Sequence, residues 1–509
     1  AVSRAVVGAL WALSVHDGLI SDLVRLGCVQ AVLVAAKALP SDEDVQSSSA
    51  ALIRNLAINE DVRWTVAEKG GIALLIGAAE SHPQSPDVAS QVACALWNLA
   101  QTSDVAGEIA ASGAVEVLVT LAAAFAGDPT VQLGVAGCLR LVCINDAAAD
   151  MVVTANGLPT LFAASRNHLK RSDVQRAFVG ALLELASHGF ASTIVQADGI
   201  GAVLRAAEAH AKEERLQARA AGVIRLLAVD DESKSLIRHS GGVALLIAAA
   251  QRFPQSGSVQ ADVAGALAVL AVDDTLEGQI AARGGISVLL DALQRHKASG
   301  AVNAHGWHAL TNLSVSSVTK KQIASTSGIK SLISSTLTTH GGAPRVVEGV
   351  ATTVRNLCDG THPDQLLESG TNLRLIQLLQ KYTQTTLVAL ALVGAIRSVA
   401  SDNSHAKQIA SLGGREALVA CGAAHKDDER LTEEVASALR RLDRGDGKEA
   451  TDKNGRNSEV RAANKTRMPF GGSTKNVTPG TAKGNLSSRL NPLMSKRKSK
   501  GGDGGMEHV

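Results

Sequence analysis

The most regular feature of the chain is a short apolar frame that returns about every 43 residues. It reads GALWALS at 8–14, ALIRNLA at 51–57 and ALWNLA at 95–100, and it continues to ALRRLD at 438–443. Its central apolar residue recurs at ten steps of 42 to 44 residues, at Leu10, Leu52, Leu96, Leu139, Leu182, Ile224, Leu267, Leu310, Val354, Ile396 and Leu439. The spacing of apolar positions within the frame is that of a helix with one buried face. A fixed period of this length predicts stacked structural repeats.

Further landmarks divide each unit into a short first helix, a middle helix and a long third helix. A glycine-centred turn follows the central apolar residue, as at Gly27, Gly71 and Gly113. Glycine ends a helix readily because it tolerates left-handed backbone. An apolar stretch such as GGVALLIAAAQRF comes next, then a polar link, then the third helix with the apolar frame. No unit can bury its apolar face alone, so we predict an all-α solenoid.

The fragments GGI-x-x-L, V-Q-x-x-x-A and A-L-x-N-L-A resemble the armadillo-repeat family. The resemblance covers about residues 1–445 and implies a right-handed α-solenoid (superhelix) of about ten to eleven armadillo repeats. The chain opens in the third helix of a partial first repeat, so we expect an upstream truncation or fraying there. Residues 446–509 are polar and rich in Gly, Ser and Asn, which predicts a disordered tail.

The charge is divided unevenly along the chain, although the net charge is only +2. Residues 446–509 hold 13 Lys/Arg against 6 Asp/Glu, whereas the remaining 445 residues hold 37 against 42. The tail is therefore basic and the body acidic. The cluster KRKSK at 496–500 suggests a nuclear signal or a contact with tubulin, nucleic acid or an anionic membrane. A merely solvated tail is the alternative.

The motifs of common enzymes are missing from this sequence. It contains no Walker A, no HExxH and no GxSxG, so we predict no enzymatic activity and no cofactor. The six cysteines form no CxxC or Cys/His ligand set, which predicts no metal site and favours a reducing compartment: the cytoplasm, with the nucleus as a second location. No apolar run reaches 18 residues, so we expect no membrane span, and we expect a monomer.

A helical wheel places Leu96 and Leu99 on the core side of the third helix, and Trp97 and Asn98 on the exposed side. The resemblance implies that this strip lines a concave groove, where asparagine typically holds the main chain of an extended peptide. The positions equivalent to Asn98 form the asparagine column, which is asparagine only at Asn55, Asn98, Asn312 and Asn356. An amide suits a peptide unit because it donates and accepts, but a bridge between neighbouring helices explains these residues equally well.

The position just before it, the arginine column, is richer in residues typical of binding sites. It holds, in order, Trp11, Arg54, Trp97, Arg140, Leu183, Arg225, Ala268, Thr311, Arg355, Arg397 and Arg440. Arg and Trp are the residues most enriched in binding hot spots, although Arg is also a good exposed helix former. We favour a binding role, with Arg355, Arg397 and Arg440 making the C-terminal part the most basic.

Two more columns recur. The glycine column, four residues before the asparagine column, contains Gly8, Gly137, Gly180, Gly222, Gly265 and Gly394, which indicates close approach by a neighbouring helix or a ligand. It lacks the Trp array of importin-α-type readers, and so looks more like β-catenin-type grooves. The ring column ends the middle helices and holds six of the fourteen histidines. Stacked repeats lie too far apart for shared metal ligands, so we predict that the rings cap helices and pack against the next repeat.

These patterns predict a non-enzymatic scaffold that binds an extended, acidic or aromatic-containing segment of a partner protein. The predicted contact residues are Arg54, Asn55, Trp97, Asn98, Arg140, Arg225, Asn312, Arg355, Asn356, Arg397 and Arg440. The rival hypothesis is an electrostatic adaptor whose basic tail, rather than its groove, binds microtubules, nucleic acid or anionic membrane.

Overall fold

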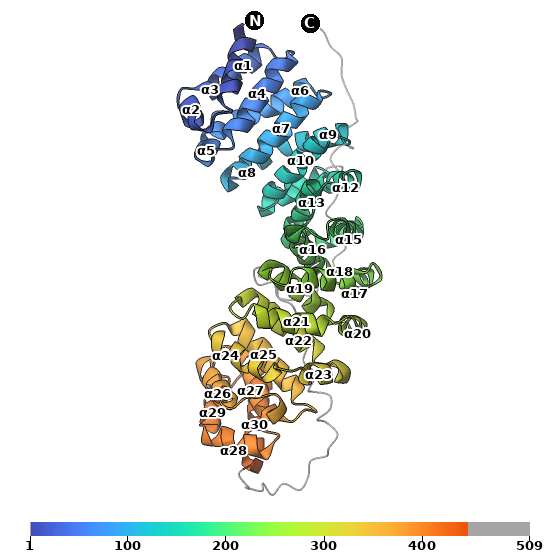
Figure 1. The fold of residues 1–509 in the computed structure, drawn as a ribbon. Coiled ribbons are helices and arrows are strands. Elements are labelled where there is room, and N and C mark those ends of the chain that lie inside the picture. The colour runs from blue at the N-terminus through green and yellow to red at the C-terminus, as the bar shows by residue number, and fades with distance from the viewer. Residues whose placement is uncertain (1, 446–509) are drawn as a thin grey trace, which may run out of the picture. The chain divides into compact units, whose positions relative to one another are not determined.

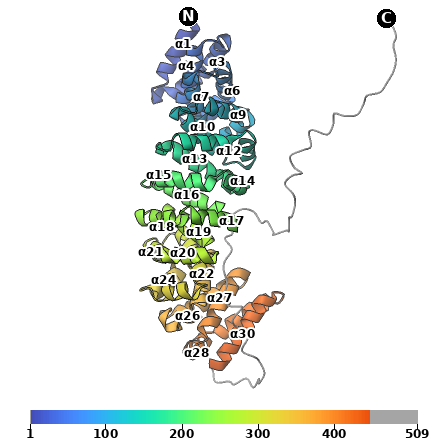
Figure 2. The ribbon, with the colours of Figure 1, turned by 90° about the vertical axis from the view of Figure 1, so that its right-hand side faces the viewer.

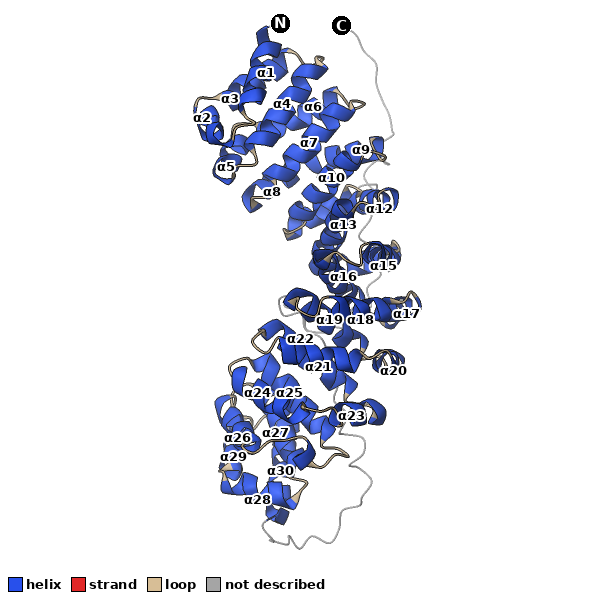
Figure 3. Cartoon of the chain, viewed as in Figure 1, coloured by secondary structure: helices blue, strands red, loops and turns tan. Residues whose placement is uncertain are grey.

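A computed structural model describes residues 2–445 of the chain, and this part is a stack of helices (Figure 1). Figure 3 shows helices joined by loops, and residues 2–445 contain no strand. Consecutive third helices lie side by side and contact each other (Figure 2). The predicted all-α solenoid is therefore confirmed. The predicted tail, residues 446–509, lies outside the described residues.

The third helices carry the apolar frame. They are α1 (Val2–Leu13), α4 (Glu43–Leu56), α7 (Pro86–Leu99), α10 (Pro129–Val142), α13 (Ser172–Leu185), α16 (Glu214–Leu227), α19 (Gly257–Leu270), α22 (Gly300–Leu313), α25 (Pro344–Leu357), α27 (Thr386–Val399) and α30 (Glu429–Gly445). Most begin with a side chain that accepts a hydrogen bond from the first turn, as Asp128 does from the backbone N–H of Val131.

The middle helices are α3 (Cys28–Ala38), α6 (Gly71–Ser81), α9 (Ala114–Ala124), α12 (Gly157–Asn167), α15 (Gly199–Ala209), α18 (Gly242–Arg252), α21 (Gly285–Arg295), α24 (Ile329–Thr339), α26 (Thr371–Lys381) and α29 (Gly414–Ala424). The first helices are α2 (Ile20–Arg25), α5 (Glu60–Glu68), α8 (Ser103–Ala111), α11 (Asp146–Thr154), α14 (Ala191–Gln196), α17 (Asp231–His239), α20 (Asp274–Ala282), α23 (Ser317–Ala324) and α28 (Asn403–Ser411). Between α25 and α26 only a short turn, η3 (Pro363–Gln365), takes the place of a first helix.

In the predicted turns before the middle helices, two adjacent positions have different requirements: one needs left-handed backbone and the other has no space for a side chain. The residue before the helix is left-handed, with a φ of 94° at Gly70 and 63° at Asn156. The residue that follows is glycine for lack of space, because a Cβ at Gly71 would lie 2.7 Å from the carbonyl oxygen of Val66. Where the predicted turn glycine is the first residue of the helix, as at Gly71 and Gly157, the left-handed residue is the one before it.

A buried glutamine joins the middle and third helices within most repeats. The Nε2 of Gln260 donates to the carbonyl oxygens of Ala250 (2.8 Å) and Phe253 (3.0 Å), the last turn of α18. The same pair of bonds recurs at Gln46, Gln132, Gln175 and Gln217. These carbonyls have no partner inside their own helix, so the glutamine supplies one. This explains the Gln of the V-Q-x-x-x-A fragment.

Gln260→Met is expected to loosen the end of α18, because it keeps the volume, leaves the Ala250 carbonyl without its donor and leaves the Phe253 carbonyl with only the Ser256 N–H. Each lost bond costs about 1 kcal/mol, so amide hydrogen exchange in the last turn of α18 should accelerate roughly tenfold or more. Exchange measured by mass spectrometry checks this, with Gln255→Met as the control because Gln255 is exposed. Unchanged exchange in Gln260→Met would contradict the role of the glutamine.

The ring column is structural, as predicted, but six of its rings bond to the preceding repeat and not to the next one, so the predicted direction is wrong. The ring nitrogen Nε2 of His210 lies 2.7 Å from the carbonyl oxygen of Leu169, and the Tyr382 hydroxyl donates to the carbonyl oxygen of Gly341 at 3.1 Å. Equivalent contacts occur at His168, His296, His340 and His425. A neutral imidazole N–H suffices for this bond, so the contacts of the ring column do not need protonated histidine.

One stretch departs from the expectation that no segment could span a membrane. By length and composition alone, Ser172–Gln196 is apolar enough to do so, with a mean hydropathy of 1.4. In the structure it comprises α13, the turn η2 (Ala186–Phe190) and α14, with a break at Gly189, where φ is 94°. Its helix α13 packs between α10 and α16 as an ordinary third helix.

Candidate functional site

The arginine column of one repeat lies across the glycine column of the next. A Cβ at Gly137 would stand 2.6 Å from the Trp97 ring, and one at Gly180 would stand 2.5 Å from Cδ of Arg140. The same relation joins Gly222 to Leu183, Gly265 to Arg225 and Gly394 to Arg355. These five glycines are therefore explained by the side chain of the preceding repeat. The close approach expected at Gly8 is wrong, because a Cβ there would meet nothing within 4 Å.

Burial divides the predicted contact residues into groups. Arg440 is exposed, and Trp97, Asn98, Arg54, Arg140 and Arg225 are half-buried. Arg355 and Arg397 are only 8% and 6% exposed. The exposed position predicted for these two is wrong. A helical wheel treats one helix in isolation, and in the solenoid the next repeats cover their side chains.

Glu434 of α30 holds the two buried arginines together. Its Oε1 accepts from Nε of Arg397 at 2.8 Å and lies 3.5 Å from Nη2 of Arg355. Burial lowers the pKa of the Arg355 guanidinium, and the charge of Glu434 opposes that shift. Sequence reasoning missed Glu434. The available signal was a carboxylate seven residues, two helical turns, before the asparagine column.

The asparagine column bridges repeats. Asn98 donates from Nδ2 to the carbonyl oxygen of Arg54 (3.0 Å), and Asn312 donates to that of Ala268 (2.9 Å). Asn356 bonds in the same way to Thr311, and Asn55 to the hydroxyl of Ser14. Asn55, Asn312 and Asn356 are buried, so the exposed position expected for them is wrong. Asn98 is half-buried and remains accessible.

Arginines gather on the third helices of the middle repeats. Arg140, Arg176 and Arg219 are half-buried and Arg215 is exposed. An Nη1 of Arg219 donates to the carbonyl oxygen of Arg176 at 3.0 Å. Burial lowers the pKa of Arg219, and the charges of Arg140 and Arg176 lower it further. The nearby carboxyl of Glu184 has its pKa raised by burial, against the opposing charge of Arg140.

One repeat further on, an acid accompanies the arginine column. Burial raises the pKa of Asp262 to about 6, while the charge of Arg225 holds it lower than burial alone would. His305 adjoins this pair and contacts the carbonyl oxygen of Ala261 through Nδ1 at 2.8 Å. Arg225 thus has the charge of one carboxylate near it, as Arg140 has that of Glu184.

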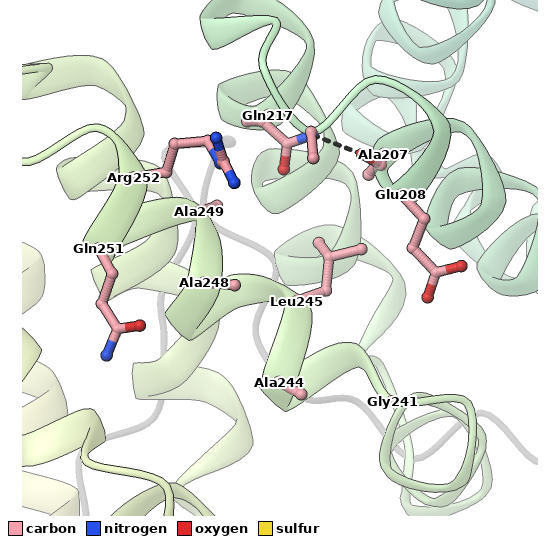
Figure 4. Close-up of a pocket in the computed structure, with 11 residues that line it drawn as sticks. Ala207, Glu208, Gln217, Gly241, Ala244, Leu245, Ala248, Ala249, Gln251 and Arg252 are labelled. Atoms are coloured by element: carbon pink, nitrogen blue, oxygen red, sulfur yellow. Dashed lines mark hydrogen bonds between the residues drawn. The ribbon is translucent and has the colours of Figure 1, made fainter. Parts of the chain in front are cut away.

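The middle helices show a different kind of surface. A hollow of about 840 Å³ lies between α15 and α18, with Glu208 and Arg252 on opposite helices (Figure 4). Five of its eleven lining residues are alanines, and the Gln217 amide at its edge already donates to Ala207. It lacks the convergent polar groups typical of a small-molecule site.

Comparison with known proteins shows the fold. A solved structure that concerns a phosphorylation switch controlling the interaction between cadherin and β-catenin is similar to 87% of this chain, over 88% of its own length. The TM-score is 0.71 and the sequence identity 17%. The chain is an armadillo-like solenoid. No family model matches it, and no curated protein does.

This likeness and the columns together define the candidate site. We call the third-helix surface the part of the third helices formed by Arg54, Trp97, Asn98, Arg140, Arg176, Arg219 and Arg440. Sequence reasoning predicted Arg54, Trp97, Asn98, Arg140 and Arg440 of this set, and missed Arg176 and Arg219. Their charge was visible, but their nearness to Arg140 depends on the register between repeats. All six cysteines are free thiols, and residues 2–445 contain no group of His, Cys, Asp or Glu suited to a metal.

Proposed function

We propose that this protein is a non-enzymatic scaffold that binds an extended segment of a partner protein along the third-helix surface. One observation supports this most: Trp97 and Arg140, in consecutive repeats, lie against Gly137 and Gly180 of the next repeat. A row of side chains fixed in this way loses little entropy on binding, and Arg and Trp are the typical hot-spot residues.

The same structure favours recognition of side chains over recognition of the partner's main chain. Most amides of the asparagine column are buried and bonded to the preceding repeat. The half-buried arginines are instead suited to acidic side chains, and Trp97 to an aromatic one. The likeness to a solenoid studied with cadherin is consistent with a protein partner. Among individual proteins, the 43-residue spacing is similar to that of armadillo repeat-containing protein 6.

Arg54→Glu combined with Arg440→Glu is expected to reduce partner capture roughly tenfold or more, since each reversal places a negative charge against an acidic segment. Affinity purification of the full chain from its source cell, quantified by mass spectrometry, measures the loss. Cross-linked peptides should map the partner to the third-helix surface. Circular dichroism should stay unchanged, because neither residue is buried.

The control is Arg205→Glu combined with Arg252→Glu, which makes the same change of charge on exposed residues of the middle helices α15 and α18. Equal capture by both double variants would contradict the proposal. Deleting residues 446–509 tests the rival function of the basic tail: if capture follows the tail and ignores the third-helix surface, the electrostatic adaptor is the better account.

A further inference from the structure

Three consecutive repeats meet at Gly180. Arg140 reaches it from α10, with Cδ 2.5 Å from the position a Cβ would take, and Arg219 reaches it from α16, with Nη1 3.1 Å from that position. Both guanidinium side chains therefore lie over the same glycine of α13. Like charges at this separation repel, and the half-buried site screens the repulsion less than water would.

The same three positions recur near the C-terminal end of the solenoid with one charge reversed. There Arg355 of α25 lies over Gly394 of α27, with its Cδ 2.8 Å from the position a Cβ would take. The residue that corresponds to Arg219 is Glu434 of α30, whose carboxylate is 3.5 Å from Arg355. At these positions the C-terminal repeats have an ion pair, Arg355 with Glu434, whereas the middle repeats have two arginines, Arg140 and Arg219.

Positive charges outnumber negative ones near Gly180. In the part that the structure describes, neither Arg140 nor Arg219 forms an ion pair, and the charge of a single carboxylate, that of Glu184, acts on both. Arg176 and Arg215 add two more positive charges beside Arg219. An anion from outside would meet several guanidinium donors at once, as the Glu434 carboxylate meets Arg355 and Arg397.

We propose that Arg140 and Arg219 bind an anionic side chain of the extended partner segment, a carboxylate or a phosphorylated serine or threonine. The anion takes the place between them that the Glu434 carboxylate takes in the C-terminal repeats. This proposal rests on the proposed function and adds the chemistry and the place of one contact. It moves the anion contact from the C-terminal arginines, which Glu434 neutralises, to the middle repeats.

The test uses the full chain and three short fluorescein-labelled peptides that differ only at central positions carrying glutamate, phosphoserine or glutamine. Fluorescence anisotropy should show binding of both anionic peptides and much weaker binding of the glutamine peptide. Arg219→Glu should weaken the anionic peptides roughly tenfold or more, the usual worth of a charge-assisted contact. The relative loss for glutamate and phosphoserine tells which anion the site prefers.

Arg205→Glu is the matched control, because it makes the same charge change at an exposed residue of α15 and should alter affinity about twofold or less. Arg219→Glu should also raise the melting temperature, since its carboxylate completes the pair that Glu434 completes elsewhere. Arg219→Gln, which removes charge without adding any, should weaken the anionic peptides as well, and it serves as the binding test if Arg219→Glu folds poorly.

Three results would overturn this inference: failure of wild type to prefer the anionic peptides, equal weakening by Arg219→Glu and Arg205→Glu, or full affinity in Arg219→Gln. A partner captured on the third-helix surface with undiminished affinity for Arg219→Glu would overturn the anion contact and leave the scaffold standing. Capture that ignores the third-helix surface altogether would remove the proposed function itself.

Discussion

Replacing Arg397 with glutamate is expected to unfold the C-terminal repeats. The side chains of Arg397 and Glu434 are 7% and 17% exposed, so the substitution brings two carboxylates together in a site with little water. Breaking a buried ion pair costs about 3 to 5 kcal/mol, and the charge reversal adds repulsion. In a solenoid each repeat is stabilised only by its neighbours, so the loss should fall on α27 to α30 and leave the N-terminal repeats folded.

Hydrogen exchange resolved by peptide checks this prediction, because it reports on each repeat separately. Combining Arg397→Glu with Glu434→Arg restores opposite charges and should recover part of the protection. Arg440→Glu is the matched control, since Arg440 is exposed one repeat further on. Normal protection of α27 to α30 in Arg397→Glu would show that this pair contributes little to the fold. Because Arg397→Glu is expected to unfold these repeats, it is a poor probe of binding.

Gly134→Ala is expected to lower the melting temperature, although alanine is the better helix former. A Cβ at Gly134 would lie 2.8 Å from Cβ of Ala93 and 3.0 Å from the backbone nitrogen of Cys94. The backbone of α7 cannot rotate away as a side chain could, so α7 and α10 must move apart. Overpacking of this kind costs about 1 to 3 kcal/mol, which outweighs a gain of up to about 1 kcal/mol in helix propensity.

Gly107→Ala is expected to raise the melting temperature, the opposite of Gly134→Ala. Gly107 lies inside α8, and a Cβ there would meet nothing within 4 Å. Only the gain in helix propensity remains, so the melting temperature should rise. Calorimetry of the two variants beside wild type measures both shifts. A rise in both would mean that α7 and α10 separate at little cost.

The sequence alone was enough to predict the repeat, its three helices and the structural role of the rings, because these follow from periodic local signals, but it did not predict that the rings bond to the preceding repeat. It did not predict the burial of Arg355 and Arg397, which depends on side chains one and two repeats away. The role of Glu434 and the meeting of Arg140 with Arg219 were missed for the same reason. Helical periodicity describes one helix, whereas these contacts depend on the register between three of them.

The bonds of the asparagine column and the ring column run in one direction, from side chains in the later repeat to oxygen atoms in the earlier one. His210 donates to Leu169, Asn98 to Arg54, and Arg441 to the carbonyl oxygen of Arg397 at 2.9 Å. A growing chain emerges from the ribosome with its N-terminal end first. Each newly folded repeat therefore presents acceptors, and the next repeat arrives with the matching donors. For these two columns, the order of synthesis is also the order in which the bonds can form.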